Sequence, residues 1–164
     1  MMKCVDVGPD DVHELMDINN RAVPHVNRLN EADLRSILAQ TCFAKKVEQG
    51  DQIAGFLLVL GPGQPYQSPN YQWFAHRFDH FAYVDRIVVH ESSRGAGVGQ
   101  MLYQALHDYC GQEQIGCICC EVNIRPENPG SAAFHQSWGF TSVGTQETEG
   151  GTKQVDLLVK KLKP

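Results

Sequence analysis

The sequence predicts one α/β domain, a mixed sheet with helices packed on it. Apolar runs at strand spacing alternate along the chain with segments whose apolar residues recur at helical spacing, and this alternation is typical of a sheet flanked by helices. The chain has 164 residues, 42% of them hydrophobic, which suits a single domain over residues 1–164 that buries about two-thirds of its unfolded surface. No internal repeat or low-complexity tract divides it.

The N-terminal half is predicted to hold a strand, two helices and a hairpin. In chain order these are a strand over 3–7, a helix that starts at 8–10 and ends near 24, a helix after 30, and hairpin strands over 43–47 and 53–60. Asn30 is a suitable N-cap for the second helix. The motif Gly61-Pro62-Gly63-Gln64-Pro65 ends the second hairpin strand.

The C-terminal half is predicted to alternate strands with two helices. The elements are a strand over 81–89, a helix ending at 110, a strand over 117–124, a helix over 129–137, and strands over 140–143 and 155–162. Gly111 is expected to stop the first helix, while Asn128 and Gly139 are expected to begin and end the second.

Charge and hydropathy exclude some partners. The formal net charge is −5, and the basic residues are scattered apart from Lys160-Lys161-Lys163, so no nucleic-acid footprint is expected. The longest apolar run, 53–60, is far shorter than a bilayer span, and Met1-Met2-Lys3-Cys4 lacks the apolar stretch of a signal peptide. We therefore expect a cytoplasmic protein with no membrane partner.

Six cysteines raise the question of a metal site or disulfides. The cluster Cys117-Ile118-Cys119-Cys120 has no second pair at zinc-ligand spacing, so no metal is expected. Strand alternation places Cys117 and Cys119 on one face and Cys120 on the other, where cysteine behaves as a small apolar residue. Reduced thiols fit a cytosolic protein.

The loop Arg94-Gly95-Ala96-Gly97-Val98-Gly99 carries the main functional signal. It lies between the apolar run Ile87-Val88-Val89 and an amphipathic helix. Glycines let the backbone approach a ligand closely, and the helix directs its first N–H groups and positive dipole end at an anion. The loop therefore predicts a phosphate or pyrophosphate site.

The spacing of the residues in this loop distinguishes between three kinds of phosphate-binding loop. A dinucleotide fingerprint needs glycine at its sixth position, where Gln100 stands, and a triphosphate loop needs Lys followed by Ser or Thr after its last glycine. The remaining pattern, Arg followed three and five residues later by glycine, resembles the acetyl-CoA pyrophosphate loop of the GNAT superfamily of N-acetyltransferases.

The resemblance extends over roughly Tyr83 to Val143. Asn128-Pro129-Gly130-Ser131 and Trp138-Gly139-Phe140 are similar to the family's second conserved block. The resemblance implies a mostly antiparallel central sheet whose splayed middle strands hold the pantetheine arm of acetyl-CoA. It also implies backbone contacts from Ile87, Val88 and Val89, pyrophosphate contacts from Arg94 to Gly99, and further cofactor contacts from Asn128 and Ser131.

Acetyl transfer to an amine needs a base, an oxyanion site and an acid for the departing thiolate. By resemblance, backbone N–H groups near Val89 serve the oxyanion. The family's usual tyrosine acid falls at His135, which either donates the proton or is a packed core histidine. For the base, Asp85 is the first candidate and Glu121 the second, and each is otherwise an ordinary ion-paired or solvated carboxylate.

The segment from Tyr66 to Phe81 is unusually aromatic for a loop. It is interpreted as a wall over the amine site, as a cover on the sheet, or as a homodimer contact. In the first interpretation Trp73, Phe74 and Tyr83 contact the acceptor. Asn27 and Arg28 lie where members of the family often border the acceptor.

Two functions follow. The first is an acetyl-CoA-dependent N-acetyltransferase that acts on a primary amine of a small molecule or peptide by direct transfer in a ternary complex. The alternative is a non-catalytic acyl-CoA-binding sensor or interaction domain.

Overall fold

The computed structural model describes residues 1–163 and contains seven strands in one sheet. The strand order is β1-β2-β3-β4-β5-β7-β6, and four of the neighbouring pairs are antiparallel. The chain divides into two compact units, residues 1–60 with 84–113 (unit 1) and residues 61–83 with those from 114 on (unit 2). The mixed, mostly antiparallel sheet flanked by helices confirms the expected fold class.

Strand β4 (Ala82–Val89) contributes to both units. Ala82 and Tyr83 pair in parallel with Ile118 and Cys119 of β5. From Val84 on, β4 belongs to unit 1.

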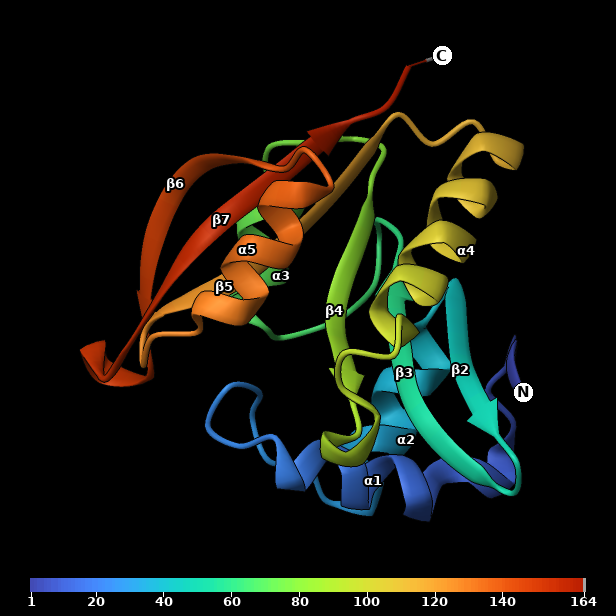
Figure 1. Ribbon diagram of the computed structural model, residues 1–164. Helices are drawn as coiled ribbons and strands as arrows, with labels where there is room; N and C mark the ends of the chain where they lie inside the picture. Colours follow the sequence, from blue (N-terminus) through green and yellow to red (C-terminus); the bar gives the residue numbers. More distant parts are fainter. Residues whose placement is uncertain (164) are drawn as a thin grey trace. The chain divides into compact units, whose positions relative to one another are not determined.

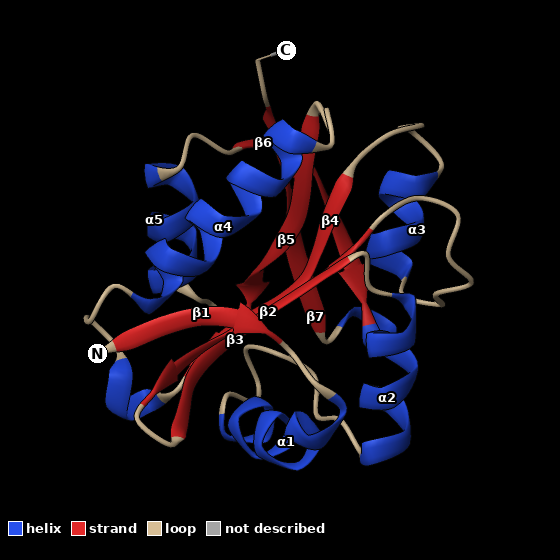
Figure 2. Ribbon diagram, turned by 90° about the vertical axis from the view of Figure 1, so that its right-hand side faces the viewer, coloured by secondary structure: helices blue, strands red, loops and turns tan. Residues whose placement is uncertain are grey.

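Unit 1 is a sheet with helices on both faces. Its other elements are β1 (Met2–Asp6), the 3-10 turn η1 (Pro9–Asp11), α1 (Val12–Arg21), α2 (Glu31–Gln40), β2 (Phe43–Gln49), β3 (Gln52–Leu60), the 3-10 turn η2 (Glu91–Ser93) and α4 (Val98–Gln112). Figure 2 shows α4 on one side of β1–β3 and α1 and α2 on the other. Strand β3 is accordingly buried on both faces, since every residue after Gln52 is buried.

Two helix ends in unit 1 differ from the sequence expectations. Helix α1 stops at Arg21, before Pro24, because the chain turns through a 22–25 hydrogen bond. Helix α4 continues through Gly111 to Gln112, and Gln114 takes the positive φ of 56° that ends it. Asn30 caps α2 as expected, since its side chain accepts a hydrogen bond from the Asp33 amide.

Unit 2 is an antiparallel layer between two helices. Its elements are α3 (Pro69–Ala75), β5 (Cys117–Arg125), α5 (Pro129–Ser137), β6 (Thr141–Thr148), the 3-10 turn η3 (Glu149–Gly151) and β7 (Lys153–Lys161). Figures 1 and 2 show α5 on one side of β5 and β7 and α3 on the other. Strand β6 is longer than the predicted 140–143 because its pairing with β7 runs on to Thr148 and Lys153.

The predicted limits of α5 are confirmed by its caps. The Asn128 side chain accepts a hydrogen bond from the Ser131 amide, and Gly139 has a φ of 87° directly after the C-cap Trp138. The aromatic segment 66–81 forms α3 and its flanks, with Tyr71 and Phe74 buried. None of the helices described in residues 1–163 is long and apolar enough to cross a membrane.

A close contact at Gly55 holds α4 against the sheet. A Cβ at Gly55 would lie 2.7 Å from a methyl carbon of Val98 and 2.8 Å from the carbonyl oxygen of Val88. The second neighbour is backbone and cannot rotate away. The absence of a side chain on β3 therefore sets how closely the start of α4 and strand β4 approach it.

Gly55→Ala is expected to lower the free energy of unfolding by about 1–3 kcal/mol, because overpacking against backbone forces the strands apart. Gly111→Ala is the matched control, since a Cβ there meets no atom within 4 Å and alanine is favoured by about 1 kcal/mol in a helix. Urea unfolding of both variants measures the two effects, and equal stabilities would contradict this account of Gly55.

Candidate functional site

The loop between β4 and α4 has the geometry of an anion site. Gly95 and Gly97 have φ values of 78° and 84°, which disfavour any residue with a Cβ. Gly97 is the N-cap of α4 and supplies no side chain to its first turn. The first N–H groups of this 15-residue helix are therefore left for an external acceptor.

The surfaces of this loop are accessible. Arg94, Gly95, Ala96 and Gly97 are exposed, whereas Val98 is buried against Gly55 and anchors the loop. Within residues 1–163 Arg94 makes no hydrogen bond or ion pair, so its guanidinium is available to a ligand. Gly99 lies inside α4. Residues 94–97 thus form an exposed turn that leads into the positive end of the α4 dipole, and the loop from Arg94 to Gly99 is called the cradle below.

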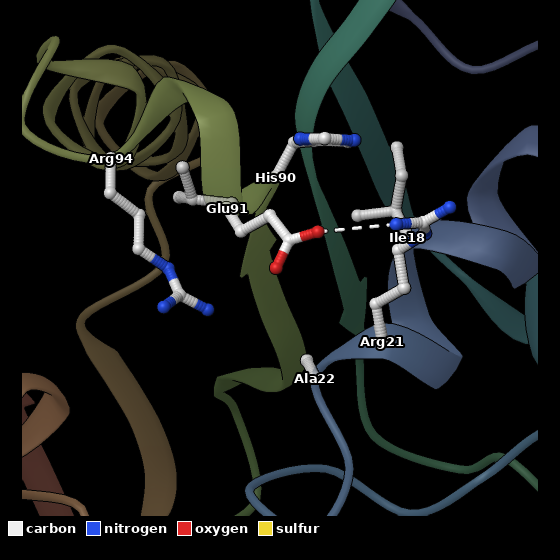
Figure 3. Close-up of a pocket in the computed structure, with 7 residues that line it drawn as sticks. Ile18, Arg21, Ala22, His90, Glu91 and Arg94 are labelled. Carbon is white, nitrogen blue, oxygen red and sulfur yellow. Dashed lines mark hydrogen bonds and ion pairs between the residues drawn. The ribbon is translucent and has the colours of Figure 1, made fainter.

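A small pocket adjoins the cradle within unit 1. Its lining residues come from the end of α1, the end of β4 and the loop after it: Ile18, Arg21, Ala22, Val89, His90, Glu91 and Arg94. Arg21 donates from Nη1 to Glu91 at 3.1 Å, and Figure 3 shows Arg94 apart from this ion pair. His90 accepts at Nδ1 from the Ser92 amide at 3.1 Å, which fixes its ring.

At the end of β4, the strand before the cradle, backbone N–H and C=O groups point alternately toward β3 and away from it. The His90 amide donates to the Ala54 carbonyl at 2.7 Å, and the Val88 carbonyl also faces β3 at Gly55. Because backbone groups alternate in direction along a strand, the N–H and C=O groups of Ile87 and Val89 point away from β3. These two residues have the backbone orientation that a ligand lying along the other edge of β4 requires, whereas Val88 does not.

Asp85, the first candidate base, is part of a buried ionic network. Its side chain is 4% exposed and accepts a hydrogen bond from Arg86 Nε at 2.6 Å. Arg86, 7% exposed, also donates from Nη1 to the side chain of Asn19 at 2.8 Å. The alternative interpretation from the sequence, an Asp85–Arg86 ion pair, is what the structure contains.

Glu121, the second candidate base, lies beside a tyrosine in unit 2. The Tyr83 hydroxyl donates to Glu121 Oε1 at 2.6 Å. Tyr83 is fully buried and packs edge-on against Tyr71 with ring centroids 5.4 Å apart. Glu121 itself is half-buried. The structure thus gives Glu121 a fixed orientation and an uncharged hydrogen-bond donor.

Phe74 and Trp73, the other two residues predicted to contact the acceptor, differ in how exposed their side chains are. Phe74 is fully buried and packs on Tyr83, with ring centroids 5.9 Å apart, so it supports Tyr83 from within the core. Trp73 is half-buried and carries the Arg77 guanidinium 3.8 Å above its ring. Of the aromatic residues predicted to contact the acceptor, Trp73 presents the accessible surface.

His135 is a buried histidine with a fixed tautomer. It is 2% exposed, and Nδ1 lies 2.8 Å from the Ser131 carbonyl oxygen, which can only accept. Nδ1 therefore carries the proton. Burial lowers the pKa of His135 below its ordinary value of 6.5, partly opposed by this hydrogen bond. The ring is neutral at pH 7 and packs edge-on against Phe134 and Phe140.

Asn128 and Ser131 lie together at the start of α5. The Asn128 side-chain oxygen accepts from the Ser131 amide at 3.3 Å, and the Ser131 hydroxyl lies 3.4 Å from His135 Nδ1. Within unit 2 the structure thus groups Asn128, Ser131 and His135, and separately Tyr83 and Glu121. Within unit 1 it groups Arg94 to Gly99 with Ile87 to Val89.

Sequence reasoning missed the partners of these residues. Asn19 was not singled out, although a polar residue four positions after the buried Leu15 lies on the apolar face of α1, a signal that predicts a buried polar contact. Gly55 was hidden within a continuous apolar strand. Cys117, Cys119 and Cys120 are buried, and none of the three is in a disulfide.

Comparisons with known structures show the same fold. Ard1 from Thermoplasma volcanium matches with a TM-score of 0.81 at 13% identity over 99% of each chain. The ribosomal-protein-S18-alanine N-acetyltransferase of Escherichia coli matches with 0.76 at 16% identity, over 98% of this chain and 94% of that one. NAA60 of Arabidopsis thaliana, bound to a bisubstrate analogue, matches with 0.77 at 15% identity over 98% of each chain.

The comparison with family models agrees with this fold, and the search of curated proteins adds nothing to it. No match was found among curated proteins. The model of the acetyltransferase (GNAT) family matches residues 12–140, a range that contains the cradle, β4, β5 and α5. Because this match spans most of the chain, the protein belongs to the GNAT family of acetyltransferases, a family that binds acetyl-CoA or CoA.

Proposed function

We propose that the protein is an acetyl-CoA-dependent N-acetyltransferase that transfers the acetyl group directly to a primary amine in a ternary complex. The observation that carries the proposal is the cradle at the start of α4, with two glycines at positive φ and an unpaired, exposed Arg94. The fold neighbours include several N-acetyltransferases, which supports an amine as the acceptor.

The cradle is assigned to the pyrophosphate of acetyl-CoA. The N–H groups of the first turn of α4 and the Arg94 guanidinium bind the phosphate oxygens, since both are charge-assisted donors. The outward backbone groups of Ile87 and Val89 pair with the pantetheine amides. Asn128 and Ser131 are assigned further contacts to the cosubstrate, which for Asn128 use the amide nitrogen because its oxygen caps α5.

Glu121 is assigned the role of general base, ahead of Asp85. The Asp85 carboxylate is already engaged by the Arg86 guanidinium in a buried ion pair, so it is not free to contact an amine. Glu121 is oriented by a neutral phenol and is not fully buried. It takes a proton from the amine, the amine nitrogen bonds to the thioester carbon, the carbon–sulfur bond breaks, and the proton passes to the CoA thiolate.

His135 is assigned a structural role. A neutral imidazole whose Nδ1 proton is donated to the Ser131 carbonyl has no additional proton for a leaving thiolate at pH 7. Its position between Phe134 and Phe140 instead joins α5 to the chain that follows it. Catalysis is therefore expected to survive its replacement by a neutral residue.

Arg94→Ala is expected to weaken acetyl-CoA binding about tenfold or more, because a hydrogen bond to a charged group contributes about 1.5–3 kcal/mol. Gly97→Val is expected to have a similar effect, since a β-branched residue is strained at a φ of 84°. Calorimetric titration with acetyl-CoA measures both, with Arg35→Ala, at an exposed position of α2, as the control. Wild-type affinity in both variants would exclude this cradle as the binding site.

Glu121→Gln is expected to lower kcat about 100-fold while acetyl-CoA affinity stays within about twofold, since a general base contributes about 10²–10⁴ to the rate. Release of free CoA thiol with a panel of primary amines and peptides measures the turnover. Glu147→Gln, an exposed carboxylate on β6, is the control. Unchanged kcat would refute the assignment, and acetyl-CoA binding without turnover on any amine would favour the non-catalytic acyl-CoA sensor.

His135 is expected to make the native state acid-sensitive. Because its pKa is lowered in the folded state, the unfolded chain binds the proton first as the pH falls below about 6.5, and stability is lost there. His135→Gln removes this titrating group. The difference in free energy of unfolding between the wild type and the variant is therefore expected to shift against the wild type as the pH falls from 7.5 to 5.5. The shift is at most about 1.4 kcal/mol per pH unit. Urea unfolding across that range tests this, and a pH-independent difference would contradict it.

A further inference from the structure

Tyr83 and Glu121 are neighbours on one face of the sheet in unit 2. Tyr83 pairs with Cys119 of β5, and Glu121 is two residues further along that strand. Because side chains two positions apart on a strand lie on the same face, the Glu121 side chain is diagonal to the Tyr83 ring and within its reach. The hydrogen bond from the Tyr83 hydroxyl to Glu121 Oε1, 2.6 Å long, therefore follows from the register of the two strands.

Helix α3 packs on the Tyr83 ring. The ring centroids of Tyr71 and Phe74 lie 5.4 Å and 5.9 Å from that of Tyr83, and all three side chains are buried. Tyr71 is anchored in turn, since its hydroxyl donates to the Gly61 carbonyl at 2.8 Å and accepts from the Gln64 amide at 3.1 Å. The Tyr83 ring is thus enclosed, and packing sets the direction of its hydroxyl.

The face of the sheet that carries this pair is the face covered by α3. Figures 1 and 2 show α3 and α5 on opposite sides of β5 and β7. A hydrogen bond of 2.9 Å from the Gln146 side chain on β6 to the Asn70 side chain attaches α3 to the same sheet. Ser131, assigned to the cosubstrate, belongs to α5 and so to the other face. A change at Tyr83 is therefore expected to leave acetyl-CoA binding intact.

The Tyr83 hydroxyl supplies what a general base needs from a neighbour. A base transfers a proton efficiently only when its oxygen is held within hydrogen-bond reach of that proton, and a small misplacement lowers the rate. A phenol donates one hydrogen bond and carries no charge at neutral pH, so it orients a carboxylate without forming an ion pair with it. The half-buried Glu121 side chain has such a donor on an enclosed ring.

We propose that Tyr83 is a positioning residue for acetyl transfer: its hydroxyl, held by the packing of α3 on its ring, orients the Glu121 carboxylate toward the amine. The proposal rests on the proposed N-acetyltransferase activity and on Glu121 as its base. Tyr83 is fully buried and touches neither substrate. Its effect is therefore on kcat, through Glu121.

Tyr83→Phe is the informative change, because it removes the hydroxyl and keeps the ring that packs against α3. Tyr109→Phe is the matched control, since it removes a tyrosine hydroxyl that bonds to the Cys42 thiol on an element outside the proposed site. Glu121→Ala and the double variant with Tyr83→Phe complete a cycle. Steady-state kinetics with the best amine of the thiol-release panel and calorimetric titration with acetyl-CoA are measured for each protein.

Tyr83→Phe is expected to lower kcat about tenfold, because a hydrogen bond to a charged group is lost. KM for the amine and the Kd for acetyl-CoA are expected to stay within about twofold, as is kcat of Tyr109→Phe. In the Glu121→Ala background Tyr83→Phe is expected to change kcat by less than about twofold, because groups that act as a unit are not additive. Wild-type kcat in Tyr83→Phe, or an equal fall in both backgrounds, would overturn the proposal.

Phe74→Leu is a second variant that keeps the Tyr83 hydroxyl and loosens the packing on its ring. It is expected to lower kcat with an unchanged Kd for acetyl-CoA, and it decides the question if Tyr83→Phe does not fold. Unchanged kcat in Phe74→Leu would then contradict the role given to α3 and Tyr83.

Failure of the proposed function is distinguishable. Urea unfolding of the same four proteins measures the coupling between Tyr83 and Glu121 and needs no turnover, and the two substitutions are expected to be non-additive in free energy of unfolding. A coupled pair in a protein that binds acetyl-CoA and acetylates no amine contradicts the activity, and with it the positioning role. Additive unfolding in an active enzyme contradicts the link between Tyr83 and Glu121 alone.

Discussion

The contact among Gly55, Val88 and Val98 is the constraint on which the cradle depends. A helix N-terminus binds an anion well when its first N–H groups are held still and aimed at one place. Here the first residue of α4 is pinned by its own side chain against a glycine of β3, while the strand that leads into the loop approaches the same glycine with a carbonyl oxygen. The loop between β4 and α4 is thus held at both its ends by close contacts that require the absence of a side chain at Gly55.

The two candidate carboxylates differ in the group that holds them. The Asp85 carboxylate accepts from the Arg86 guanidinium at 2.6 Å in a buried ion pair, and loss of either partner would leave a buried charge uncompensated. Glu121 also has a donor at 2.6 Å, yet that donor is the neutral hydroxyl of Tyr83. The Glu121 carboxylate is thus oriented by an uncharged group, whereas the Asp85 carboxylate is committed to an ion pair.

The sequence was most informative where the physics is local. The end of α5 at Gly139 and its cap at Asn128 are predicted from residues within one turn of each helix end, and the structure confirms both. The link from Asn19 to Arg86 joins residues 67 positions apart, and Tyr83 to Glu121 joins residues 38 apart. Such pairs depend on how strands and helices meet, and no short-range pattern encodes them. Helix α4 runs one residue past Gly111, so a single glycine is a weak stop signal.

The alternation of inward-facing and outward-facing side chains along β4 also limits where the chain can gain or lose residues. The strand is paired at its first two residues with β5 and at its end with β3, so its register is fixed from both directions. One inserted residue would turn Arg86 and Val88 outward and bring their neighbours into the core. An insertion or deletion is therefore expected to disturb the fold least outside residues 82–89, for example in the turn at Glu149–Gly151.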